Sequence, residues 1–165
     1  MKRVLSIQDI SCIGKCSLTV ALPIISAMGI ETSILPTSIL STHTMFNDFT
    51  FRDLTDDMEP IKKHWQKEGF SFDAIYTGYL GSEKQITLVK DYFKTFGNTC
   101  KYIIVDPAMA DNGKLYSGFD KDFPLKMAKL CKYADVILPN ISEAAFMTGM
   151  PYPGENASNP CQTWF

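Results

Sequence analysis

The sequence predicts a single α/β domain, a three-layer sandwich in which helices cover a mostly parallel central sheet. Short apolar runs that suit buried strands alternate along the chain with segments whose apolar residues recur at helical spacing. Strands that alternate with helices favour parallel pairing through right-handed crossovers. The chain has 165 residues, which suits one domain with a sizeable core, and no internal repeat or linker divides it.

The first half of the chain alternates strand and helix signals. The expected elements are, in order, a strand at 3–8, a helix at 16–28, a strand at 31–35, an irregular stretch at 38–53 and a helix at 56–68. Gly29 ends the first helix, and Pro23 inside it predicts a kink or an early break. Pro36 is expected to end the second strand and to open the irregular stretch.

The second half continues the alternation. The expected elements are a strand at 72–76, a helix at 83–96, a strand at 102–105, a helix at 122–133, a short strand at 135–138 and a helix at 141–147. Ser82 with Gln85 three residues later has the capping-box pattern of a helix start. Asn140 and Glu143 repeat that pattern, and Gly149 stops the last helix.

Composition excludes several classes of partner. The net charge is −2, which gives no electrostatic footprint for nucleic acid or an anionic membrane surface. No apolar run is long enough to span a bilayer, and the apolar start is too short for a signal peptide. The five cysteines are scattered, which favours reduced thiols and a cytoplasmic protein over a disulfide framework.

Small and polar residues follow every predicted strand. The sets are Asp9, Ser11 and Gly14; Ser41, Thr42, His43 and Thr44; Gly78, Tyr79 and Gly81; Asp106, Asp111 and Gly113; and Asn140 with Glu143. The carboxyl ends of parallel strands share one edge of the sheet, so these loops are expected to converge on one cleft.

Two carboxylates stand out among these sets. Asp106 and Asp111 lie five residues apart, directly after the apolar run at 102–105. Such a pair can hold Mg²⁺, which prefers oxygen ligands and usually binds together with phosphates. The alternative interpretation is a turn capped by aspartates.

Each remaining candidate has a structural and a functional interpretation. His43 is a base or ligand partner, or else a hydrogen-bonded structural histidine beside threonines. Tyr79, between two glycines, presents its ring to a flat ligand or fills the core at a strand end. Asn140 and Glu143 either cap a helix or orient water on a nucleotide-bound Mg²⁺.

These motifs together resemble the pyridoxal/pyridoxamine kinases of the ribokinase-like superfamily, from residue 1 to about residue 149. The similarity is carried, in order, by Ser6-Ile7-Gln8 with Gly14, Ser41-Thr42-His43-Thr44, Thr77-Gly78-Tyr79-Leu80-Gly81-Ser82, Val105-Asp106-Pro107 with Asp111, and Pro139-Asn140-Ile141-Ser142-Glu143. The resemblance implies a ribokinase-like domain over 1–149 that transfers the γ-phosphoryl group of ATP, with Mg²⁺, to the 5′-hydroxymethyl group of vitamin B6. It also suggests a homodimer.

The resemblance implies roles for particular residues. The substrate, which is pyridoxal, pyridoxamine or pyridoxine, is expected to contact Asp9, Ser11, His43, Thr44 and Tyr79. The ATP phosphates are expected near Asp106, Asp111, Asn140 and Glu143, with Asp111 and Glu143 as metal ligands. Residues 45–53 are expected to belong to a flap over the substrate.

The chain also departs from the family pattern. Asp9 stands at a position where many pyridoxal kinases have serine, and the related hydroxymethylpyrimidine kinases have an aspartate near this position. Leu138 replaces a threonine that is common in the family. The family's later Gly-Thr-Gly-Asp motif, which supplies the anion hole and the catalytic base, has no match here, so the catalytic residue is unassigned.

The last segment, 150–165, has three prolines and no periodicity, and it is expected to be an irregular or disordered tail. Together with the missing motif, it predicts a C-terminally truncated chain. Two functional alternatives therefore stand beside a pyridoxal kinase: a non-catalytic substrate-binding fragment and a hydroxymethylpyrimidine kinase.

Overall fold

A six-stranded, mostly parallel sheet forms the centre of the computed structural model, which describes residues 1–154. Its strand order is β3-β2-β1-β4-β5-β8. The parallel strands are β1 (Arg3–Ser11), β2 (Glu31–Leu40), β4 (Ala74–Thr77), β5 (Tyr102–Val105) and β8 (Val136–Ile137). The edge strand β3 (Phe51–Asp53) runs antiparallel to β2. The α/β fold class expected from the alternating pattern is confirmed.

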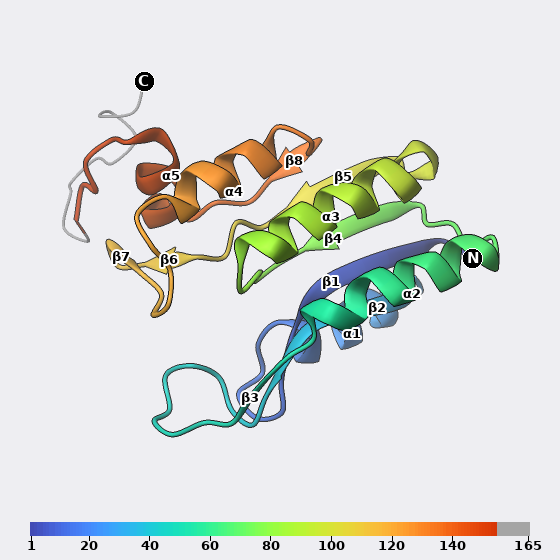
Figure 1. Cartoon of the computed structure of the whole chain (residues 1–165), viewed down its shortest axis with the longest axis horizontal. Helices are drawn as coiled ribbons and strands as arrows, with labels where there is room; N and C mark the ends of the chain where they lie inside the picture. The colour runs from blue at the N-terminus through green and yellow to red at the C-terminus, as the bar shows by residue number, and fades with distance from the viewer. Residues whose placement is uncertain (155–165) are drawn as a thin grey trace.

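Helices lie on both faces of this sheet. Three of them, α2 (Thr55–Lys67), α3 (Glu83–Phe96) and α4 (Phe123–Cys131), lie side by side on one face (Figure 1). The helix α1 (Leu18–Ala27) lies on the opposite face, against β1 and β2, and α5 (Ile141–Thr148) packs beside α4. This arrangement gives the three layers that the sequence predicts.

The main core lies between the sheet and the three-helix layer. Leu5, Ile75 and Val105 from three adjacent strands are fully buried with Met127 and Tyr92 from the helices. The Tyr92 hydroxyl donates a hydrogen bond of 2.6 Å to a backbone carbonyl of α2, so this buried polar atom is satisfied. The core therefore fixes the sheet as a rigid platform for the loops at its carboxyl edge.

Two prolines behave differently from expectation. The helix α1 continues past Pro23 to Ala27, so of the predicted kink or early break the break is wrong. The strand β2 continues past Pro36 to Leu40, so the irregular stretch begins later than expected. The partner β3 pairs with β2 only at residues 38–40, which leaves β2 a free edge at Pro36. Proline is tolerated at such an edge because no ladder hydrogen bond is lost there.

A small hairpin interrupts the loop after β5. Its strands are β6 (Ala110–Asp111) and β7 (Lys114–Leu115), and Asn112 and Gly113 form the turn with φ values of 49° and 72°. Asn-Gly is the preferred sequence for two-residue hairpin turns with positive φ at both positions. The signal was present in the sequence, but the hairpin was not predicted.

Other features of the described residues bear on the earlier expectations. None of their helices has the length and apolar character required to cross a membrane. Cys12, Cys16, Cys100 and Cys131 are free thiols, and Cys161 lies outside the described residues. Of the tail expected at 150–165, residues 151–154 have no helix or strand, and 155–165 lie outside the described residues.

Candidate active site

A cleft of about 660 Å³ opens at the carboxyl edge of the sheet, where four of the five predicted loop sets meet. Its lining includes all five residues expected to contact the substrate: Asp9, Ser11, His43, Thr44 and Tyr79. Asp111 also lines it, together with Tyr116, which sequence reasoning missed. Asp9 and Ser11 belong to β1 itself rather than to the following loop, because the strand runs three residues further than expected.

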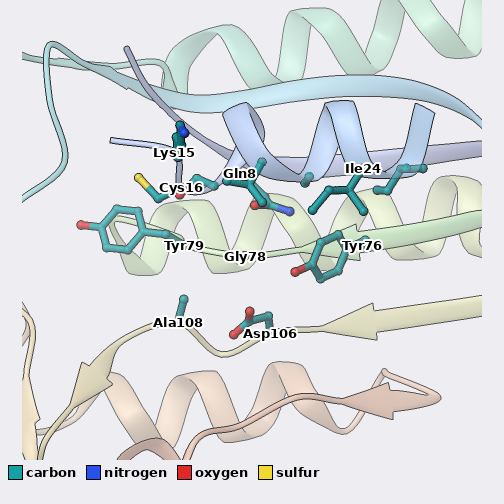
Figure 2. A pocket seen from close by; sticks show the side chains of 13 residues that line it. Gln8, Lys15, Cys16, Ile24, Tyr76, Gly78, Tyr79, Asp106 and Ala108 are labelled. Atoms are coloured by element: carbon teal, nitrogen blue, oxygen red, sulfur yellow. The ribbon is translucent and has the colours of Figure 1, made fainter. Parts of the chain in front are cut away.

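A second hollow of about 450 Å³ adjoins this cleft beneath α1. Figure 2 shows Gln8, Tyr76 and Asp106 around it, with Tyr79 at the side that it shares with the cleft. Asp106 therefore borders this hollow, whereas Asp111 borders the cleft. The two carboxylates that the sequence groups together thus line neighbouring spaces.

Asp9 is the most unusual polar group of the cleft. Its side chain lies at a register shift between β1 and β2, and the residue is only 5% exposed. One carboxylate oxygen, Oδ2, accepts a hydrogen bond of 3.3 Å from the Ser11 hydroxyl, while Oδ1 is buried and has no hydrogen-bond partner among residues 1–154. Burial raises the pKa of Asp9 because desolvation disfavours the charged form. An unpaired buried acceptor at a cleft is suited to receive a donor from a ligand.

His43 connects two loops at the mouth of the cleft. Its Nδ1 accepts a hydrogen bond of 3.3 Å from the backbone N–H of Met45, and the backbone N–H of His43 donates to the carbonyl of Ile13. The ring lies so close to Gly14 that an added Cβ there would come within 2.1 Å of it. Gly14 also has a φ of 130°, which side chains rarely adopt. These contacts match the structural interpretation of His43, and the residue also lines the cleft, so its role toward a ligand stays a prediction.

Tyr79 is held from two directions. Its ring packs against Phe119 with a centroid distance of 5.6 Å, and its backbone carbonyl accepts a hydrogen bond from the Thr37 hydroxyl. Burial, followed by the charges of Asp9 and Asp53, raises the pKa of Tyr79, so the phenol stays neutral at physiological pH. This supported aromatic ring gives the cleft one apolar wall.

Asn140 and Glu143 form a complete capping box at the start of α5. The Asn140 side chain accepts from the backbone N–H of Glu143 at 2.9 Å, and Glu143 Oε2 accepts from the backbone N–H of Asn140 at 2.8 Å. The other oxygen, Oε1, accepts from the N–H of Met109 at 3.2 Å, and Asn140 Nδ2 donates to the carbonyl of Ala110. The box therefore also attaches α5 to the loop after β5.

Glu143 is an unusual capping residue because it is buried, with only 2% of its surface exposed. Burial raises its pKa to about 7, and the backbone hydrogen bonds from Asn140 and Met109 oppose that rise. Both of its oxygens are engaged by backbone donors, so its role as a metal ligand stays a prediction and requires those bonds to be exchanged.

The hairpin β6–β7 carries Asp111 at the cleft. Its carboxylate accepts a hydrogen bond of 2.9 Å from the backbone N–H of Asn112, and the N–H of Gly113 donates to the Ser142 hydroxyl at 2.8 Å. Asp111 is exposed and therefore accessible to a ligand. Within residues 1–154, however, no three His, Cys, Asp or Glu side chains are placed to share a metal ion. Any metal site here needs oxygen ligands from a bound phosphate or from water.

Comparison with known proteins agrees with this fold. A family model described as phosphomethylpyrimidine kinase matches residues 31–162. A crystallised Bacteroides thetaiotaomicron protein that carries the phosphomethylpyrimidine kinase name, in a form with pyridoxal, is 45% identical, with a TM-score of 0.88 over 92% of this chain and 53% of that one. Pyridoxal kinase from Lactobacillus plantarum is 38% identical, with a TM-score of 0.86 over 92% of this chain and 54% of its own.

The curated relatives point in the same direction. Pyridoxal kinase PdxY of Actinobacillus pleuropneumoniae is 28% identical over 159 residues, which cover 91% of this chain and 54% of the relative. The fold and the cleft define a kinase-type α/β domain of the ribokinase-like class. More narrowly, the chain belongs to the pyridoxal kinase / phosphomethylpyrimidine kinase family, and it spans about half the length of the curated relatives that it matches.

Proposed function

We propose that the protein is a pyridoxal kinase, which transfers the γ-phosphoryl group of ATP to the 5′-hydroxymethyl group of vitamin B6, and that this chain supplies the vitamin site. The observation that carries the proposal is the convergence of Asp9, His43, Thr44 and Tyr79 on one cleft. The likeness to the Bacteroides protein crystallised with pyridoxal supports it.

The cleft residues have complementary tasks in this proposal. The unpaired Oδ1 of Asp9 accepts a hydrogen bond from a donor on the substrate ring. The Tyr79 ring packs on the flat face of the vitamin, and the Thr44 hydroxyl hydrogen-bonds its substituents. The segment that starts at His43 closes the mouth of the cleft and excludes water, which strengthens the electrostatic interactions inside.

The nucleotide side rests on the loop after β5. Asp106 and Asp111 would hold Mg²⁺ beside the ATP phosphates, because both follow β5 and each of them borders one of the two hollows. When bound, the ion neutralises the charge that develops during phosphoryl transfer. Asn140 and Glu143 keep this loop in place through their bonds to Met109 and Ala110. The catalytic base and the anion hole are unassigned in this chain.

A hydroxymethylpyrimidine kinase is the second candidate. Asp9 favours it, because a carboxylate there differs from the serine of many pyridoxal kinases, and the family model that matches is described as phosphomethylpyrimidine kinase. The third alternative, binding without transfer, applies to this chain if the base and anion hole come from elsewhere. Homodimerisation and a cytoplasmic location stay predictions, as does the absence of nucleic-acid and membrane partners.

The experiment is ATP- and Mg²⁺-dependent phosphorylation by the purified chain, with pyridoxal and hydroxymethylpyrimidine compared as acceptors. Binding is measured in parallel with pyridoxine, which lacks the aldehyde that would condense with lysines. Preferential phosphorylation of pyridoxal supports the kinase proposal, and preference for the pyrimidine supports the second candidate. Binding without turnover supports the fragment alternative, and failure to bind either alcohol contradicts all three.

A further inference from the structure

Gln85 is a buried amide whose hydrogen bonds join three separate segments around the cleft. The residue is 1% exposed, in the first turn of α3. Its Oε1 accepts from the backbone N–H of Gly81 at 2.8 Å. Its Nε2 donates to the carbonyl of Thr37 at 3.0 Å, the Thr55 hydroxyl at 2.9 Å and Asp53 Oδ1 at 3.3 Å. Both ends of the amide are therefore satisfied inside the protein.

Each of these partners belongs to a segment that borders the cleft or leads into it. Gly81 lies in the loop that carries Tyr79, and Asp53 ends β3, the strand that returns from residues 41–50. Thr37 lies in β2 and makes a second link, because its hydroxyl donates to the carbonyl of Tyr79 at 3.4 Å. Gln85 is thus joined to the Tyr79 loop directly through Gly81 and indirectly through Thr37.

This arrangement is separate from helix capping. The capping hydrogen bond of α3 runs from the backbone N–H of Gln85 to the Ser82 hydroxyl at 3.3 Å. The Gln85 side chain turns inward instead of returning to Ser82, so the reciprocal capping box predicted from the sequence is only half formed. A substitution that changes only the Gln85 side chain leaves the cap in place.

We infer that Gln85 is a positioning residue that fixes the Tyr79 loop against the base of the flap, so that the Tyr79 ring is held ready for the substrate ring. An amide is required because it supplies an acceptor for Gly81 and donors for Thr37 and Asp53 at the same time. A carboxylate at this position would face Asp53 with a like charge, and an apolar side chain would leave several buried groups unpaired.

The inference rests on the proposed binding of a B6 vitamer, and its test uses the Gln85→Met variant of the full chain. Methionine has a similar volume and no amide. Pyridoxine affinity is expected to fall about tenfold, because loops misplaced by a fraction of an ångström lose contacts to a rigid ring. In a Tyr79→Ala background the same change is expected to cost less than about twofold, because the loop no longer carries the ring.

The control is Tyr92→Phe, which also removes one buried hydrogen bond but lies in the core, away from the cleft. It is expected to lower stability without changing pyridoxine affinity. If Gln85→Met does not fold, Thr37→Val takes its place, because it removes only the hydrogen bond to the Tyr79 carbonyl. Its effect on pyridoxine affinity is again compared with and without the Tyr79 ring, and the expected loss of affinity is smaller. Equal losses of affinity in the presence and absence of the Tyr79 ring would overturn the inference.

Hydrogen–deuterium exchange separates this inference from the proposed function. In Gln85→Met, the amide of Gly81 and the amides at 53–55 are expected to exchange faster together, while those of β1 stay protected. Unchanged exchange at Gly81 would refute the inference whatever the binding result. Faster exchange at Gly81 and at residues 53–55, in a chain that binds no vitamer, would support the coupling of the Tyr79 loop to the base of the flap. The same result would reject the proposed function.

Discussion

Glu143 gives a quantitative prediction about stability, because it is a buried carboxyl whose pKa lies far from that of an exposed glutamate. Burial raises that pKa from 4.5 to about 7. Between these two pH values the folded state binds more protons than the unfolded state, so stability falls as pH rises through this window. The change corresponds to about 3 kcal/mol, since each tenfold change in proton affinity is worth about 1.4 kcal/mol.

The perturbation is Glu143→Gln, which removes the titration. Glutamine still accepts from the backbone N–H of Asn140, but its NH₂ group then faces the N–H of Met109, so about 1 kcal/mol is lost at pH values where Glu143 is protonated. Urea unfolding followed by the fluorescence of Trp65, which packs in the aromatic core, measures the free energy of unfolding at about pH 5 and pH 8.

The wild-type chain is expected to lose about 3 kcal/mol more than the variant over this range. The matched control is Glu59→Gln, an exposed glutamate whose pKa is lowered by its hydrogen bond to Lys63, so its contribution has the opposite sign. Parallel stability profiles for the wild type and Glu143→Gln would refute the assignment of a raised pKa to this buried cap.

Three further substitutions test the cleft and the hairpin. Gly14→Ala is expected to displace the His43 ring, because the added Cβ would come within 2.1 Å of it, and so to weaken pyridoxine binding at least tenfold. The positive φ also costs the folded state about 1–3 kcal/mol. Calorimetric titration measures the affinity, and an unchanged affinity would contradict the packing described. Asp9→Ser is expected to raise the ratio of the affinity for pyridoxal to the affinity for hydroxymethylpyrimidine about tenfold, as measured by competition binding. A constant ratio would mean that the carboxylate does not contact the ring. Gly113→Ala is expected to lower the free energy of unfolding by about 1–2 kcal/mol in urea unfolding. Residue 113 has a φ of 72°, and a Cβ added there would come within 2.6 Å of the Tyr152 ring. An unaltered unfolding midpoint would argue against that contact.

The order of strands and helices was predictable because burial imposes a period on the sequence. Apolar runs such as 102–105 match β5 to the residue, and the topological rule for parallel sheets correctly brought Asp9, His43 and Tyr79 to one cleft. The capping box at Asn140 was predictable because its two partners lie only three residues apart in the sequence. Local signals therefore account for the frame and for most of the cleft lining.

Interactions between distant segments were not predictable. The partners of Gln85 lie up to 48 residues away, so the sequence pattern indicated only a helix cap. Asp106 and Asp111 line neighbouring hollows, and Asp111 lies in the first strand of a hairpin that was not predicted. The length of β2 depends on where β3 pairs with it. The strand propensities of the residues around Pro36 give no information about that pairing.

The central claim is that this chain holds the vitamin site of a pyridoxal kinase, and saturable binding of pyridoxine to the purified chain tests it most directly. Calorimetric titration of the wild type is compared with Tyr79→Ala, which removes the aromatic wall of the cleft. We expect binding at one site per chain, and we expect Tyr79→Ala to weaken it at least tenfold. No saturable binding by the folded wild type, or equal binding by both proteins, would contradict it.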